Sequence, residues 1–479
     1  MGSVSSEGVH SQPKPETRGR SGALPGPLGL LLAAVALSSC GGLTSASPGT
    51  PRSEAQPATA TNLPCVQNEQ GTGCLPIAPL ADRVDLEAPS FSNPTHVDNP
   101  LHPTGQIQSA VYLGSAGGLP FRSEVTLLPL TKIIELNGQP VEVLESQYFA
   151  TLNGRIHEVA LDWYAQADDG SVWYFGEDVF NYEDGRVADT YGTWLAGRDG
   201  PAAMIMPAQP QVGHVYRPEN IPGVVFEEVM VQATSVTVDG PIGPVPGAIV
   251  VRELHMDGSY EEKTFAPGYG EFFTGGGGDL EALALAIPTD FQSGALPEEL
   301  TTLSTDTDRI FDSALRRDWQ AAKAELAGVL AAWEGLREVQ VPGMLESEMD
   351  RALEALSLAV GSQQAAEAGQ AAIGVGRAAL DLQLQYRPST EIEMARFQLM
   401  ARQLGLDAAA EDTAGVSGDV ASLVWIRDRF IQRLSNPEAQ SINGLLGEIR
   451  AAADGEDLQA AAQAAGRLGD LLVLLRPPP

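Results

Sequence analysis

The stretch "DWYAQADDGSVWYFGED" at residues 162–178 decides the fold class, because it predicts a strand, a tight turn and a second strand. Asp169-Gly170 is a preferred centre for a two-residue hairpin turn. On the first strand, period-two alternation places Trp163 on a core-facing side and Asp162 and Tyr164 on the opposite side. The stretch therefore indicates an antiparallel hairpin with aromatic side chains on both faces.

The second strand leaves two interpretations open. Alternation over residues 171–177 places Trp173 and Glu177 on one face and Tyr174 on the other. In the first interpretation, the aromatic side chains simply fill a curved sheet. In the second, an open end of the sheet holds a ligand-binding pocket with a rim of Asp162, Tyr164, Glu177 and Asp178.

The same turn chemistry recurs on both sides of this hairpin and predicts an antiparallel β-meander or barrel-like domain over residues 96–278. The turn dipeptides are Asn137-Gly138, Asn153-Gly154, Asp169-Gly170, Asp184-Gly185 and Asp257-Gly258. Four glycines at 275–278 are expected to form a hinge to the next domain, and "DLEALALAI" at 279–287 resembles a helix. The glycine run is followed by Asp279 and lacks a Gly-Lys-Ser/Thr ending, so it is not a phosphate-binding loop.

The pieces "DWYAQ", "GSVWYFGED", "AGRDG" and "APGYG" together resemble a domain found in exported bacterial proteins of unknown function. The resemblance covers about residues 97–270. It implies an exported β-domain and carries no activity with it.

The second half of the chain is predicted to be all-α, which makes the fold class α+β with several domains. Ala-, Leu- and Glu-rich segments begin at Asp318, Ser362, Asp412 and Asp457, about 45 residues apart as in helical-hairpin repeats. Each of these residues is a natural helix N-cap. We expect two four-helix halves at 300–387 and 388–476, separated at Pro388, and the region resembles the alanine-rich helical repeats of exported bacterial proteins.

Residues 18–42, "RGRSGALPGPLGLLLAAVALSSCGG", have the form of an export signal, with arginines before a short apolar run. The ending Leu-Ser-Ser-Cys at 37–40 resembles the lipobox of bacterial lipoproteins. The resemblance implies a signal peptide at 1–39 and acylation of Cys40. We therefore expect a lipid-anchored protein on the extracytoplasmic side of a cell membrane or outer membrane.

Two further cysteines, Cys65 and Cys74, are nine positions apart and are expected to form a local disulfide in an exported chain. They lie in a region rich in Ser, Thr, Pro and Ala. Residues 40–95 are therefore expected to form a disordered tether.

The formal net charge of −33 excludes nucleic acid as a partner, because a phosphate backbone would be repelled. The helical half contains neither His nor Cys, so no haem or zinc site is expected there, and we expect no cofactor and no metal. His157, His214 and His255 lie in or beside separate strands, and their spacing predicts no catalytic triad.

These features favour a non-catalytic protein of the bacterial cell envelope that binds a small molecule or a protein partner. The alternative is a cell-envelope hydrolase that uses the acidic end of the β-domain. A third hypothesis is a cation-buffering protein that exploits the negative charge.

Overall fold

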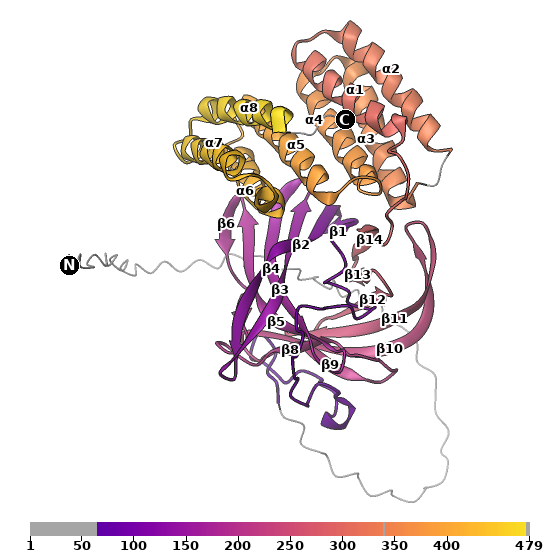
Figure 1. Cartoon of the computed structure of the whole chain (residues 1–479), viewed down its shortest axis with the longest axis vertical. Helices are drawn as coiled ribbons and strands as arrows, with labels where there is room; N and C mark the ends of the chain where they lie inside the picture. Colours follow the sequence, from indigo (N-terminus) through magenta and orange to yellow (C-terminus); the bar gives the residue numbers. More distant parts are fainter. Residues whose placement is uncertain (1–64, 339–340, 476–479) are drawn as a thin grey trace, which may run out of the picture. The chain divides into compact units, whose positions relative to one another are not determined.

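The computed structural model describes residues 65–338 and 341–475 and joins a fourteen-stranded antiparallel sheet to eight helices (Figure 1). The predicted α+β multidomain class is therefore confirmed. In the described parts of the chain, none of the helices has the length and apolar character needed to cross a membrane. The predicted signal peptide and Cys40 lie outside the described residues.

Two meanders build the sheet. The first contains β1 Ser109–Ala116, β2 Leu119–Leu136, β3 Gln139–Leu152, β4 Arg155–Gln166, β5 Val172–Glu183 and β6 Arg186–Asp189. Two short strands pair with β5, namely β7 Trp194–Leu195 and β8 Ala203–Met206. The second contains β9 Val215–Ile221, β10 Val225–Gly240, β11 Gly243–His255, β12 Tyr260–Ala266, β13 Gly270–Gly276 and β14 Asp279–Ile287.

The strand order is β6-β5-β4-β3-β2-β1-β14-β13-β12-β11-β10-β9, so the pairing of β1 with β14 joins the two meanders. The sheet is meander-like, as predicted, but not closed, because among the described strands β6 and β9 stand at its two ends.

The hairpin turns follow the predicted chemistry. At Asn137-Gly138, for example, both residues have positive φ, 53° and 76°, as a type I′ turn requires.

The predicted helix at residues 279–287 is wrong, because this segment is strand β14. It pairs with β1 on one side and β13 on the other, and residues 283–287 are buried. Two-sided pairing and burial override the helix propensity of its Leu and Ala residues. The predicted glycine hinge is also wrong, because Gly277 and Gly278 form the hairpin turn between β13 and β14.

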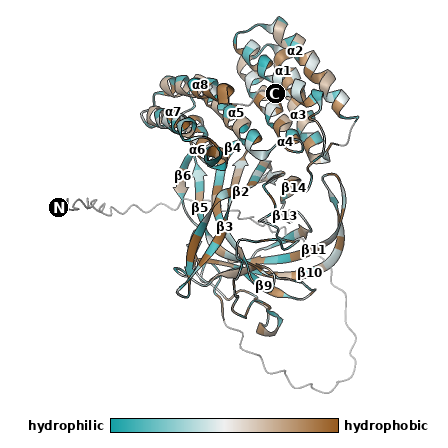
Figure 2. Ribbon diagram, in the orientation of Figure 1, coloured by the Kyte–Doolittle hydropathy of each residue, from teal (hydrophilic) through white to brown (hydrophobic). Residues whose placement is uncertain are grey.

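The sheet curls so that side chains from its two ends meet on one face, which we call the inner face. Trp194 in β7 donates from Nε1 to Glu219 in β9 at 3.1 Å. One buried apolar cluster joins Tyr174 and Trp194 with Tyr216 and Val251 of the second meander. Hydrophilic and hydrophobic residues are interspersed along these strands, as Figure 2 shows.

The lead-in before β1 helps to fill the inner face. Leu101 belongs to the same apolar cluster, and the ring centroid of His102 lies 4.9 Å from that of Tyr164 in β4. The backbone N–H of Gly268, in the β12–β13 turn, donates to the Pro100 carbonyl at 2.8 Å. This segment therefore contacts both meanders and holds them together.

Eight helices follow the sheet. They are α1 Glu298–Leu315, α2 Trp319–Leu336, α3 Gly343–Ser362, α4 Ala365–Gln383, α5 Ser389–Ala409, α6 Thr413–Phe430, α7 Asn436–Asp454 and α8 Leu458–Leu475. Asp318 and Asp412 are N-caps whose carboxylates accept from Ala321 and Gly415. The predicted cap Ser362 is wrong, because it ends α3 and Gln364 precedes α4.

The other face of the sheet, the outer face, packs against helices. Val111 and Leu113 in β1 share a buried apolar cluster with residues of α1 to α5. Beside it lies a fully buried set of charges from β2, α4, α5 and α6, which we call the sheet–helix ion cluster. Its members are Arg122, Glu124, Asp381, Glu393, Arg396 and Arg429.

The predicted disordered tether is wrong for residues 65–95, which pack against both meanders. Residues 90–94 contact the β4–β5 hairpin, where Ser90 and Ser92 donate hydrogen bonds to Asp168, and the earlier part packs against the second meander. Leu75 and Ile77 are buried in a cluster with Phe226 and Leu254. The N–H of Ala78 donates to Glu228 at 2.6 Å. A disulfide joins Cys65 to Cys74, with a Cα–Cα distance of 5.2 Å. A few buried apolar residues thus order a segment whose overall composition is polar.

Candidate functional site

The structure brings together three of the four predicted rim residues. In an antiparallel ladder, residues that face each other point to the same side of the sheet. Asp162 in β4 pairs with Glu177 in β5, and Tyr164 lies two residues along β4 on the same side. Asp178 pairs with Leu161 and therefore lies on the opposite face, near Lys132, where it does not belong to the site.

A β-bulge changes the register of β5 and brings Tyr174 into the site. The β4–β5 pairing shifts between Asp162 and Tyr164, so that Tyr174 pairs with Tyr164 while Glu177 pairs with Asp162. The prediction that Tyr174 and Glu177 occupy opposite faces is therefore wrong. Gly176 lies in the bulge with φ of 113°, and a Cβ there would lie 2.2 Å from the Trp194 carbonyl oxygen. An extra residue in one strand inverts the alternation beyond it.

Aromatic rings surround the Asp162 carboxylate. Tyr174 donates its hydroxyl to Asp162 Oδ1 at 2.8 Å. Its ring stacks on Tyr164 at 5.0 Å between centroids and meets Trp194 edge-on at 5.4 Å. The site therefore has rigid apolar walls and a carboxylate fixed between them.

The second meander completes this site with Glu219. The Glu219 carboxyl group accepts from Trp194 Nε1 and shares a hydrogen bond with the Glu177 carboxyl group. Two carboxyl groups can share a hydrogen bond only when one of them keeps its proton. Burial, together with repulsion from Glu219, raises the pKa of Glu177 well above its usual range.

Carboxyl groups of raised pKa extend from this site across the inner face. Burial is the main cause for each of them. The pKa is raised to about 7 for Glu158 and Asp162, to about 8 for Glu219, Glu253 and Glu281, and well above the usual range for Glu177. We call these six residues the inner acidic face. They come from β4, β5, β9, β11 and β14, which shows that both meanders contribute.

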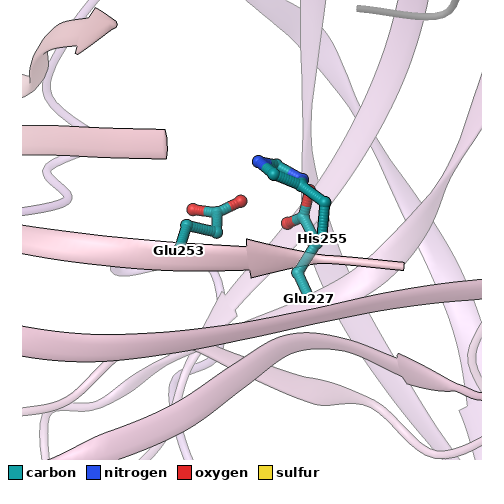
Figure 3. A group of neighbouring side chains, drawn as sticks. All are labelled: Glu227, Glu253 and His255. Carbon is teal, nitrogen blue, oxygen red and sulfur yellow. The ribbon is translucent and has the colours of Figure 1, made fainter. Parts of the chain in front are cut away.

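Glu253 of the inner acidic face also belongs to a group carried by β10 and β11, Glu227, Glu253 and His255 (Figure 3). Among the described residues, this is the only group of three or more His, Cys, Asp or Glu side chains within mutual metal-binding reach. Their ligand atoms all lie within 4.8 Å of one another. Glu227 pairs with His255 across the β10–β11 ladder. Lys263 Nζ contacts Glu253 Oε1 at 3.2 Å.

His255 lies between two carboxylates, with Nδ1 3.3 Å from Glu227 and Nε2 3.3 Å from Glu261. Burial works against the charged ring, but the hydrogen bonds to these two carboxylates raise the pKa of His255 to about 11. At neutral pH the ring is an imidazolium, so it cannot accept a proton as a general base.

Of the other described histidines, His96 and His102 do not join the site as bases. His96 lies in an exposed ion pair with Asp98 at 3.1 Å. Burial lowers the pKa of His102 to about 4, and its Nδ1 is 2.9 Å from the Thr104 hydroxyl. Neither Glu219 nor Glu253 was predicted as a site residue from the sequence. The alternation of Glu253 and His255 in "RELH" would have placed those two on one face, but the position of Glu219 depends on the curl of the sheet.

This arrangement suits recognition of positive charge. Several carboxyl groups of the inner acidic face hold protons at neutral pH because they are buried close to one another. A bound cation would replace those protons and stabilise the ionised carboxylates. The flanking tyrosine and tryptophan rings add faces that attract cations.

Comparison with protein-family models and with curated proteins finds no match to this chain.

Proposed function

We propose that the protein is a lipid-anchored protein on the extracytoplasmic side of a bacterial cell envelope, and that it binds a cationic ligand on its inner acidic face without catalysing a reaction. The observation that carries the ligand-binding part is the convergence of Asp162, Glu177 and Glu219 on three aromatic rings. Buried carboxyl groups of strongly raised pKa cost folding stability, and such groups concentrate at functional sites.

The location rests on the sequence. The apolar run that ends in Leu-Ser-Ser-Cys at residues 37–40 is similar to a lipobox. A disulfide between Cys65 and Cys74 fits an exported protein, since such bonds persist in oxidising compartments. The strongly negative charge fits a binder of cations and opposes binding of nucleic acid.

The helical half is proposed to contact a protein partner. A surface cavity of about 450 Å³ lies between α1, α4 and α5, and its lining mixes apolar residues such as Leu380 and Leu399 with the charged residues Asp308 and Arg402. A mixed apolar and charged lining is typical of protein-contact surfaces.

Spermidine is a suitable probe for the ligand site, because it presents several ammonium groups on an apolar chain. We expect spermidine to raise the melting temperature of the full-length protein by several degrees at millimolar concentration. Glu177→Gln should weaken binding about tenfold or more, because it removes a carboxylate that would face the ammonium group. Isothermal titration calorimetry measures this loss directly.

Asp178→Asn is the matched control, since Asp178 is adjacent in sequence but lies on the opposite face. Like Glu177→Gln, it replaces one carboxyl group by an amide, and it should leave spermidine binding unchanged. If both variants lost the same affinity for spermidine, the binding would depend on overall charge alone, and the inner-face site would be refuted. Absence of spermidine binding to the wild-type protein would also refute it.

The alternative is a hydrolase that uses the hydrogen-bonded pair Glu177 and Glu219. One protonated and one ionised carboxyl group can serve as acid and base. This alternative is favoured by the shared hydrogen bond and the raised pKa of both groups. It predicts that the protein releases product from a cell-envelope extract, and that Glu219→Gln abolishes the release.

A further inference from the structure

A second group of candidate ligands lies on the inner face beside the first, where Glu227 pairs with Glu219 across β10 and β9. Glu227 in β10 and Glu253 and His255 in β11 point toward one another in Figure 3. All three side chains project from the same face, because Glu227 pairs with His255 and Glu253 lies two residues before His255. Adjacent central strands fix their backbones, so the group is held by the sheet rather than by a loop.

The geometry is close to that of a bound metal. Zn–N and Zn–O bonds are about 2.0–2.2 Å long, so two ligand atoms of one zinc ion lie at most about 4.4 Å apart. The ligand atoms of Glu227, Glu253 and His255 lie within 4.8 Å of one another. A movement of a few tenths of an ångström in each side chain would close the group around an ion.

Charge also favours a cation here. Around His255 lie the carboxyl groups of Glu227, Glu253 and Glu261, and Lys263 contacts Glu253 at 3.2 Å. Carboxylate oxygens and a neutral imidazole are ligands of divalent transition-metal ions, and such an ion would displace the proton of the His255 ring on binding. Lys263 contacts Oε1 of Glu253, and the Glu253 carboxyl group also shares a hydrogen bond with Glu227, which a metal ion between the two would replace.

An independent observation comes from Tyr216 in β9. Its side chain is 1% exposed, and its hydroxyl has no hydrogen-bond partner among the described residues. Tyr216 pairs with Val229, which in turn pairs with Glu253, so all three lie in one row on the inner face. A buried hydroxyl without a partner costs free energy. A metal-bound water beside Glu253 would accept a hydrogen bond from it.

We propose that Glu227, Glu253 and His255 bind one divalent transition-metal ion, with Tyr216 donating a hydrogen bond to a water on that ion. One imidazole nitrogen with carboxylate oxygens suits zinc or manganese, whereas calcium takes oxygen ligands alone. The proposed function is argued from Asp162, Glu177 and Glu219, and none of these three is a ligand of this site. The metal site shares only Glu253 with the inner acidic face and does not rest on the proposed function.

The test titrates ZnCl₂ into full-length protein that has been stripped with a chelator, followed by calorimetry. We expect one tight zinc site per chain. Glu253→Gln and His255→Ala should each weaken it by at least about tenfold, since even outer-shell partners contribute that much. Glu262→Gln and His214→Ala are matched controls away from the group, and they should leave the affinity unchanged.

A parallel titration with CaCl₂ tests whether the site binds zinc more tightly than calcium. Calcium binding as tight as zinc binding, unaffected by His255→Ala, would show diffuse attraction to acidic groups and overturn the proposal. Zinc binding that is equally strong in Glu253→Gln would do the same. If near-ultraviolet circular dichroism shows that a variant fails to fold, X-ray absorption spectroscopy of the zinc-loaded wild-type protein tests the site instead. An imidazole nitrogen in the coordination shell supports the site, and its absence overturns it.

Discussion

At the scale of single residues, the unusual feature of this protein is how many carboxyl groups lie inside a curled sheet. Asp162 is ordered by Tyr174 and Glu219 by Trp194, so these acids have defined positions. Each is surrounded by other acids rather than by arginines, and this distinguishes the inner face from the sheet–helix ion cluster. The carboxyl groups of the inner acidic face are thus held in positions that suit binding of a positively charged ligand.

Stability should consequently depend on pH through Glu219. Burial and repulsion from Glu227 raise its pKa to about 8, so the folded protein keeps a proton that the unfolded chain loses above about pH 4.5. The stabilising contribution of Glu219 is full below about pH 4.5 and is lost as the pH rises through 8. We expect the melting temperature to fall between pH 5 and pH 8, and Glu219→Gln to reduce that fall by about 2 °C.

Differential scanning calorimetry across this pH range provides the measurement. Glu262→Gln is the control, because Glu262 is exposed on the outer face and pairs with Arg252. A pH profile that is as steep in Glu219→Gln as in the wild type would contradict the expectation.

At the scale of elements, two features determine how the strands and helices pack: the bulge at Gly176 and the sheet–helix ion cluster. The bulge at Gly176 puts Tyr174 and Glu177 on one face, and this creates the aromatic and acidic site. The sheet–helix ion cluster fixes β2 and β3 to α4, α5 and α6. In it Arg429 contacts Gln147 at 2.6 Å and Glu393 at 3.0 Å.

Arg429→Met should therefore destabilise the protein by about 3–5 kcal/mol, because it leaves buried carboxylates without their partner. Urea unfolding, followed by circular dichroism, measures the change. Arg467→Met is the control, since Arg467 forms an ion pair with Glu448 whose side chains are 58% and 60% exposed. An exposed pair contributes at most about 1 kcal/mol. Similar losses in the two variants would show that the buried cluster has no special role.

At the scale of the whole molecule, the two meanders, the lead-in at residues 97–107 and the helices pack against one another. Residues 97–107 contact both meanders, and β14 joins the second meander to the first. A ligand bound by Asp162 and Glu219 would span the two ends of the sheet. Ligand binding would then stabilise the curl as a whole, rather than one hairpin.

The proposed membrane anchor belongs to this scale as well. We expect Cys40→Ala to move the protein from the membrane fraction to the soluble fraction, because a thioether-linked lipid contributes about 0.8 kcal/mol per buried methylene group. Fractionation of cells that express the full-length chain measures the distribution. A variant that stays with the membrane would contradict lipid anchoring through this cysteine, and Cys65→Ala is the control because Cys65 lies in the disulfide.

The sequence by itself determined the class and order of the domains. Asn-Gly and Asp-Gly turns between alternating residues specify hairpins locally, and Asp caps with Pro388 specify where helices begin, so antiparallel strands followed by eight helices could be predicted. It also put Asp162 and Tyr164 on one face, because alternation over a single strand is a local property. Glu177 was named with them as a residue of the acidic end of the next strand.

Only the tertiary structure decided the rest, because those features depend on contacts between residues far apart in the chain. Residues 279–287 form a strand since β1 and β13 lie on either side of them, against their own helix propensity. Asp178 leaves the site and Tyr174 enters it because a bulge shifts one register. Glu219 joins Glu177 only because the sheet curls until its two ends meet, and no local pattern in the sequence specifies that curvature.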